Sequence, residues 1–200
     1  GSGGLLFEEL HPAAQVLMHG ALPNTTCYLD AAAPYDALMF VGQHAMAGVS
    51  DGPLCHTFSS RAIEYYKLNG AFIGEIGCIA ARFGERNVPT IFLAGDNRAC
   101  EEAQAIIPEI VTVATKKGLG VQYALHLSAE ESRRRICEGA RKAMAKINSI
   151  EPYKIGGPCE LEIRVLPDVS IEHYLNSGSY EIIDERTVVR RGENVEALFV

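Results

Sequence analysis

Two short apolar runs, each ending in a glycine, constrain the fold of this chain more than any other feature. Residues 36–42 read DALMFVG and residues 88–95 read VPTIFLAG. Strands that are apolar on both sides are typical of a parallel sheet that is covered on both faces. The second run is followed by Asp96, a good helix N-cap, and by a helical stretch that Pro108 closes. We therefore predict an α/β fold, with a mostly parallel sheet flanked by helices.

A β-hairpin is expected between the two runs. Asn69-Gly70 separates two β-prone segments, and Asn-Gly is the strongest short-range signal for a hairpin. Directly afterwards, apolar residues recur at helical spacing across residues 76–83, and Gly84 is the expected end of that helix. Glu75 is thus expected at the junction between a strand and a helix.

The second half of the chain has a different character. Ser128 opens a capping box and a charged helix that is expected to run to about Asn148, and a further helix is expected to start at Asn194. The remaining strand candidates are residues 110–114, 121–125, 159–166, 180–183 and 187–189. We predict two units: residues 1–120 form the α/β domain, and residues 121–200 form a smaller α+β subdomain.

Composition excludes several classes of partner. The formal net charge is −7, and no Lys/Arg cluster stands free of acids, so nucleic acid is not an expected partner. No stretch approaches the roughly 18 apolar residues of a membrane span, and the chain does not open with a basic segment leading into an apolar one. Six cysteines without a C-x-x-C pair indicate reduced thiols. A cytoplasmic protein without a membrane partner is expected.

Four polar residues lie where a site could form. In open α/β sheets, ligands bind beyond the carboxyl ends of the strands, and His44 and Asp96 follow such ends. Glu75 begins a helix, and His56 lies in the loop between the first strand and the hairpin. Each also has a plainer explanation: Asp96 caps a helix, the helix dipole favours Glu75, and a lone loop histidine is often a surface residue. His56 adjoins Cys55, but adjacent side chains rarely point at each other.

Known catalytic and nucleotide motifs do not decide the matter. The chain has no dinucleotide fingerprint, no P-loop and no G-x-S-x-G elbow. From the residues alone, the sequence predicts an α/β enzyme with a site near His44.

Five short motifs follow one another between about Leu5 and Lys117. They are Val41-Gly42-Gln43-His44-Ala45, then His56, then Asn69-Gly70, then Gly74-Glu75-Ile76-Gly77, and then Val88-Pro89 leading to Ala94-Gly95-Asp96. In order and spacing this series resembles the zinc D-aminopeptidases associated with bacterial dipeptide-transport operons. Each motif is weak alone, whereas five in order are specific.

The resemblance implies a dinuclear zinc site in the first domain, with two Zn²⁺ per complete chain. It places His44 and Glu75 among the ligands of one metal, and it gives His56 the role of the nucleophilic or proton-transferring histidine. The family's Asp-x-Glu and a further histidine have no counterpart in this sequence. We therefore expect the missing ligands upstream of Gly1, and this chain to supply part of the ligand set.

The function implied is that of a zinc-dependent aminopeptidase that hydrolyses the amino-terminal residue of short peptides, with the preference for D- or L-residues left open. The resemblance also implies a ring-like homo-oligomer. One alternative is a non-catalytic, ring-forming or peptide-binding relative with an incomplete metal site. Another is a hydrolase or transferase for an unrelated substrate that shares the scaffold.

Overall fold

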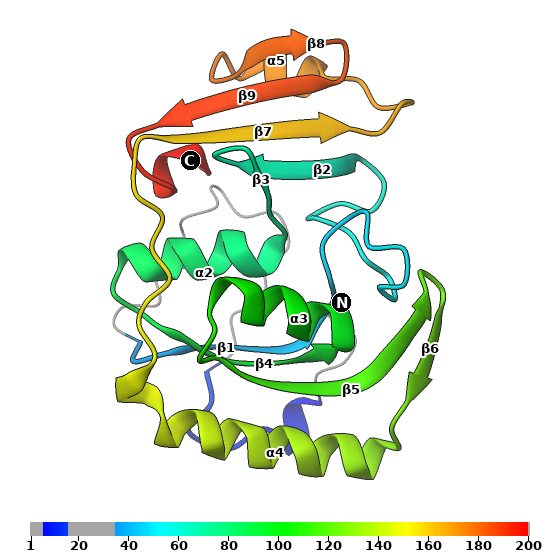
Figure 1. Cartoon of the computed structure of the whole chain (residues 1–200), viewed down its shortest axis with the longest axis vertical. Coiled ribbons are helices and arrows are strands. Elements are labelled where there is room, and N and C mark those ends of the chain that lie inside the picture. Colours follow the sequence, from blue (N-terminus) through cyan, green and yellow to red (C-terminus); the bar gives the residue numbers. More distant parts are fainter. Residues whose placement is uncertain (1–5, 16–34, 200) are drawn as a thin grey trace.

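Two β-sheets, stacked along the long axis of the molecule, form the frame of this protein (Figure 1). The structure is a computed structural model, and it describes residues 6–15 and 35–199. The first sheet, sheet A, has the strand order β1-β4-β5-β6, and the second, sheet B, has the order β3-β2-β7-β9-β8. Helices α2 and α3 lie between the sheets in this view, and α4 covers the outer face of sheet A.

Sheet A is the predicted, mostly parallel sheet. Strands β1 (Leu38–Gln43), β4 (Thr90–Asp96) and β5 (Val111–Gly120) pair in parallel, and β6 (Tyr123–His126) adds an antiparallel edge. Every residue of β4 is buried, as its apolar sequence predicts for a central strand. The prediction of an α/β fold with a mostly parallel sheet is therefore confirmed.

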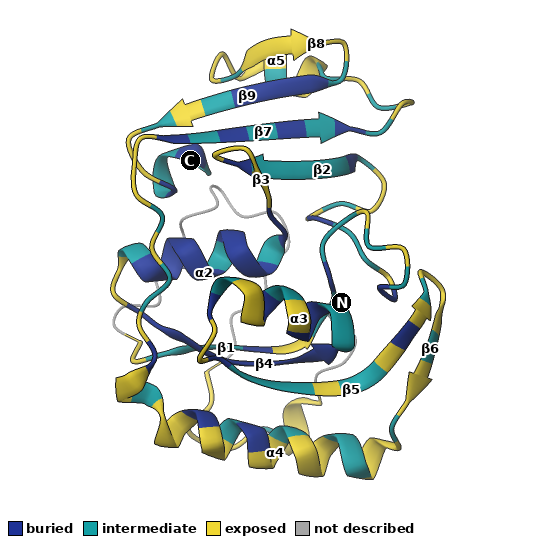
Figure 2. Cartoon of the chain, in the orientation of Figure 1, coloured by how far each residue is buried: buried dark blue, intermediate teal, exposed yellow. Residues whose placement is uncertain are grey.

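The helices α2 (Glu75–Glu85), α3 (Asn97–Ile106) and α4 (Ala129–Ala145) bury the faces of sheet A. Their shared core contains Phe92 and Leu93 of β4 together with Ile76 of α2, Ala103 of α3 and Ala143 of α4. In Figure 2, α2 is buried along most of its length, whereas α4 is exposed on its outer side. Ser128 caps α4 as predicted, since its hydroxyl oxygen accepts a hydrogen bond from the backbone N–H of Glu131. The carboxylate of Glu131, which a capping box would turn back to Ser128, pairs with Arg134 and Arg135.

Sheet B is antiparallel and combines strands from both halves of the chain. It consists of β2 (Ile63–Leu68), β3 (Ala71–Phe72), β7 (Cys159–Val165), β8 (Glu181–Asp184) and β9 (Thr187–Gly192). The hairpin predicted at Asn69-Gly70 joins β2 to β3. Alternate residues of β7 are buried, and they pack with Cys78 and Ala81 of α2. Helix α2 therefore contributes to the cores of both sheets.

The chain does not assign its strands to the two sheets in sequence order. The β2–β3 hairpin lies in sheet B, whereas β6 and α4, which follow residue 120, belong with sheet A. The two sheets therefore do not correspond to the two halves of the sequence. The predicted division into a domain of residues 1–120 and a subdomain of residues 121–200 remains a prediction. The helix expected from Asn194 is a single 3₁₀ turn, η4 (Glu196–Leu198), within the residues described.

The remaining short elements connect the larger ones. They are the 3₁₀ turns η2 (Phe7–Glu9) and η3 (Ile147–Ser149) and helix α5 (Glu172–Asn176). The charged helix expected to reach Asn148 thus ends at Ala145 and is followed by η3. The five described cysteines, residues 55, 78, 100, 137 and 159, are free thiols as predicted, and Cys27 lies outside the described residues. Among the described helices, none combines the length and the apolar character that crossing a membrane requires.

Gly84 was expected to end α2, but the helix continues through Glu85 to a cap at Arg86. The glycine has a packing role instead. A Cβ atom at this position would lie 1.8 Å from the backbone carbonyl oxygen of Tyr153, in the segment that leads to β7. Gly84 therefore allows the chain to cross closely over α2.

We expect Gly84→Ala to lower the free energy of unfolding by about 1–3 kcal/mol, because the added methyl group has to displace backbone rather than a side chain. Denaturation in urea followed by circular dichroism measures the change. Gly156→Ala is the matched control, since a Cβ there meets nothing within 4 Å. Equal stability of the two variants would refute the packing role.

Candidate metal centre

Three side chains from neighbouring segments converge beside the carboxyl end of β1. His44 follows the last residue of β1, Glu75 is the first residue of α2, and His56 lies in the loop between β1 and β2. One possible ligand atom from each lies within 4.8 Å of the other two. The structure therefore brings together the three residues to which the resemblance gives a role in the site.

The distances within this group fit a single cation. The Nε2 atom of His44 lies 3.6 Å from Oε1 of Glu75, and Nε2 of His56 lies 3.5 Å from the same oxygen. Zinc–ligand bonds of about 2.0–2.2 Å in a tetrahedral arrangement place neighbouring ligand atoms roughly 3.3–3.6 Å apart. The two imidazole rings stack, with centroids 3.8 Å apart. Imidazole nitrogen and carboxylate oxygen are ligands that Zn²⁺ prefers.

Backbone carbonyls orient both histidines. Nδ1 of His44 lies 3.0 Å from the carbonyl oxygen of Ala45, and Nδ1 of His56 lies 2.8 Å from that of Leu54. A carbonyl only accepts, so each Nδ1 carries a proton and, in the neutral ring, each Nε2 presents a lone pair to Glu75. Two lone pairs facing a carboxylate repel it unless a cation or a proton lies between them. The arrangement thus has the outer-shell hydrogen bonds that metal-binding histidines need.

Glu75 is held in place from two directions. Its backbone begins α2, where the helix dipole favours a negative charge. Its Oε1 accepts a hydrogen bond of 2.8 Å from the backbone N–H of Phe58. The three side chains are 18–27% exposed, so the group is ordered by its surroundings and still open to a ligand.

Asp96 and Cys55 have hydrogen-bond partners outside the three-residue group. Asp96 caps α3, because its Oδ1 accepts from the backbone N–H groups of Arg98 and Ala99 at 2.8 and 2.9 Å. It is not a member of the three-residue group. The thiol of Cys55 donates to the carbonyl of Val49 at 3.1 Å, which points it away from a pairing with His56.

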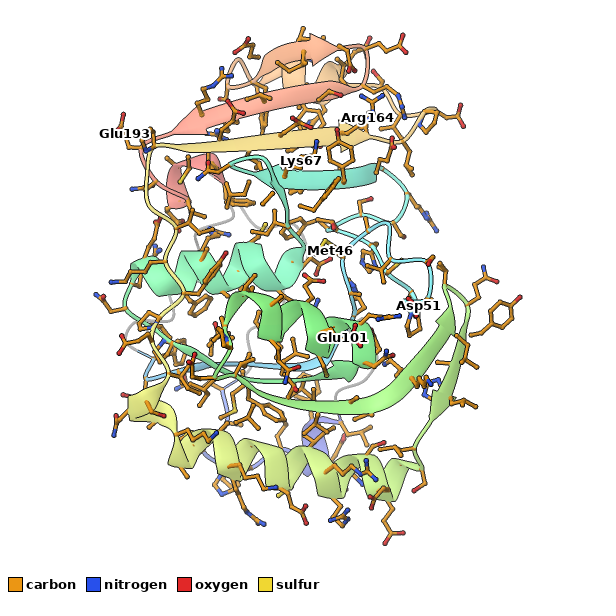
Figure 3. The ribbon with its side chains drawn as sticks, in the orientation of Figure 1. Met46, Asp51, Lys67, Glu101, Arg164 and Glu193 are labelled. Atoms are coloured by element: carbon orange, nitrogen blue, oxygen red, sulfur yellow. The ribbon has the colours of Figure 1, made fainter. Side chains whose placement is uncertain are left out.

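Glu102 is a functional candidate that the sequence did not reveal. It lies on α3, and its Oε2 accepts a 2.8 Å hydrogen bond from the backbone N–H of Met46, two residues after His44. Figure 3 shows Met46 near the start of α2. Burial, together with the nearby charges of Asp96 and Glu75, raises the pKa of Glu102 to about 7. The hydrogen bond from Met46 acts in the opposite direction and lowers the pKa.

The second carboxyl oxygen of Glu102, Oε1, is buried without a hydrogen-bond partner among the described residues. A Cβ atom at Gly74 would lie 2.4 Å from this oxygen and 2.7 Å from Cβ of Met46. Gly74 therefore lets the start of α2 approach both residues. Nothing in a glutamate within a polar helix signals this contact, because its partner is a backbone group far away in the sequence.

Comparisons with known proteins support the resemblance. The D-aminopeptidase of Bacillus subtilis (strain 168) is 28% identical over 149 residues, which cover 74% of this chain and 53% of that protein. The chain thus spans about half the length of this curated relative.

A solved structure has the same fold. It is described as the Zn-dependent D-aminopeptidase DppA from Bacillus subtilis, a self-compartmentalizing protease. It aligns with a TM-score of 0.84 at 24% identity, over 97% of this chain and 70% of that chain.

The family model for peptidase family M55, described as D-aminopeptidase, matches residues 2–200. The match covers both sheets and all three residues of the candidate metal centre, so this chain belongs to the D-aminopeptidase family M55.

Proposed function

We propose that this chain contributes part of the zinc site of an aminopeptidase that hydrolyses the amino-terminal residue of short peptides. The observation that carries the proposal is the convergence of His44, His56 and Glu75 at ligand spacing, in a member of the D-aminopeptidase family. The zinc dependence named for the structural relative supports the choice of metal. Two Zn²⁺ per complete chain and a preference for peptides with D-residues are part of the same proposal.

In this proposal His44 and Glu75 hold one metal. Both residues belong to segments that the sheets fix, one at the end of β1 and one at the start of α2. The Phe58 N–H and the Ala45 carbonyl orient the side chains of Glu75 and His44. Zinc supplies a Lewis acid that polarises the scissile carbonyl.

His56 transfers the proton in this proposal. Its Nδ1 donates to the Leu54 carbonyl, so Nε2 is the atom that accepts and returns a proton. Nε2 of His56 lies 3.5 Å from Oε1 of Glu75. The same distance would also suit a third ligand, and the two roles differ in what removing the side chain does to the metal content.

We expect the double variant His44→Ala, Glu75→Ala of the full-length protein to lose zinc, because two of the ligands of one metal are removed. Mass spectrometry of the metal content after dialysis measures the loss. His126→Ala, an exposed histidine in β6, is the control and should keep the wild-type content. Full zinc occupancy in the double variant would rule out these residues as ligands.

We expect His56→Ala to keep its zinc and to lower turnover by roughly 10²–10⁴-fold, with a smaller change in KM, because a positioned acid or base matters mainly in the transition state. The assay is release of the amino-terminal residue from a D-alanyl peptide by the full-length enzyme with zinc added. Near-wild-type turnover would assign the proton transfer to another residue. Loss of zinc would make His56 a ligand.

Assembly is the third part of the proposal. The relative's description as a self-compartmentalizing protease supports a ring-like homo-oligomer, and the free thiols support a cytoplasmic location. Strand β8 is one of the two edge strands of sheet B in the described structure, and its Ile182 and Ile183 are each about half exposed. Unpaired apolar edges are favoured contact surfaces.

We expect light scattering at micromolar concentration to give the mass of an oligomer for the full-length protein. Ile182→Lys should reduce the assembled fraction, because a charge at the contact must be desolvated. A monomeric wild-type protein would contradict the proposed assembly.

A further inference from the structure

Two bulky residues near the metal centre adopt a backbone conformation that their side chains disfavour. Within the described ranges, four non-glycine residues have a left-handed φ: Leu54, Phe58, Asn69 and Asn87. Asparagine tolerates this region, and both asparagines lie at turns, after β2 and after α2. Leucine and phenylalanine gain no such compensation, and both have a φ of 58°.

The site explains the backbone of these two residues. Each lies two positions from His56, on opposite sides along the chain. The carbonyl of Leu54 accepts from Nδ1 of His56, and the N–H of Phe58 donates to Oε1 of Glu75, both at 2.8 Å. Their left-handed turns therefore aim backbone groups at the candidate metal centre.

The site does not explain their side chains, because glycine or asparagine would adopt the same backbone with less strain. Leu54 is 70% exposed and Phe58 is 45% exposed. The Phe58 ring packs against two aromatic rings, and its centroid lies 5.4 Å from that of Tyr66 and 6.3 Å from that of Phe199. Packing within the fold thus leaves much of both apolar side chains open to water.

We propose that Leu54 and Phe58 bind the apolar side chains of the peptide residues that flank the scissile bond, and so determine substrate specificity. The inference rests on the proposed aminopeptidase function. The backbone groups of both residues contact members of the candidate metal centre, so their side chains lie within a few ångströms of it along the loop. Among the described residues of that loop, they are the large apolar groups that remain exposed. The substrate class is therefore short peptides with apolar residues at the amino terminus, rather than polar ones.

The test uses the variants Leu54→Asn and Phe58→Asn in the full-length, zinc-loaded enzyme. Asparagine keeps the left-handed backbone, as at positions 69 and 87, and removes the apolar contact. We expect kcat/KM for the D-leucyl-D-leucine dipeptide to fall about 10-fold or more, mainly through KM, with a much smaller change for D-alanyl-D-alanine. Zinc content should stay at the wild-type level in both variants. The thermal unfolding midpoint of Leu54→Asn should be unchanged or higher, because strain is relieved.

Two controls separate specificity from structure. Phe58→Leu keeps an apolar side chain and should retain most of the selectivity for leucyl peptides. Phe72→Asn removes an exposed aromatic side chain from β3 and should leave the ratio of the two kcat/KM values unchanged.

An equal loss for leucyl and alanyl peptides, or a parallel loss of zinc, would overturn the inference and reduce both residues to supports of the backbone. A change in oligomer mass with unchanged selectivity would overturn it as well, and would assign the two side chains to a contact between copies. If the wild-type enzyme hydrolyses no peptide, the proposed function fails separately. Isothermal titration calorimetry with the same dipeptides then tests whether Leu54 and Phe58 contact the peptide. Equal affinity of the leucyl dipeptide for the wild type, Leu54→Asn and Phe58→Asn would overturn that contact.

Discussion

The packing of α2 between two sheets is the constraint on which the rest of this structure depends. Ile76 and Ala80 join the core of sheet A, while Cys78 and Ala81 join the core of sheet B. A helix that is apolar on nearly all sides cannot be stable at a surface, so both sheets must close over it. The first residue of this helix is Glu75, and its position is therefore set by both cores.

Polar contacts at the other end of α2 complete this arrangement. Arg82 is buried, and its guanidinium lies 3.0 Å from a carboxylate oxygen of Glu196. Glu85 accepts from the backbone N–H of Val195 at 2.7 Å. A buried charge without a partner would be costly, so these contacts fix the last turn of the described chain, η4, against the helix. The candidate metal centre is thus positioned by residues that are far from it.

The candidate metal centre combines two residues at the ends of regular elements with one residue in a loop. His44 and Glu75 come from element ends, where the backbone is determined by hydrogen bonds of the sheet and the helix. His56 comes from a loop, and that loop is supported by a hydrogen bond of 2.7 Å from the N–H of Leu54 to the carbonyl of Val121, at the turn between β5 and β6. Sites built on loops need such supports to hold their geometry.

The sequence predicted the parts of this structure that depend on local patterns. The apolar runs and the Asn-Gly turn indicated β1, β4 and the β2–β3 hairpin, and the order of motifs indicated His44, His56 and Glu75. Gly84 was misread because a glycine near the end of a helical pattern suits both a helix end and a close crossing of two backbones. Only the position of Tyr153 distinguishes the two. Likewise, nothing about a leucine signals the left-handed turn at Leu54, since tertiary contacts impose it.

The pairing of β2 with β7 was equally beyond local patterns, and it has a consequence for the order in which the molecule can form. Tyr66 pairs with Ile163 and Leu68 with Leu161, so β2 has its main partner almost a hundred residues later in the chain. On the ribosome, sheet A and its helices can assemble once α4 has emerged, but the face of α2 that carries Cys78 stays open until β7 arrives. Before β7 is added, α2 has only one of its two cores, so the packing of the helix that begins with Glu75 depends on residues far downstream of the site.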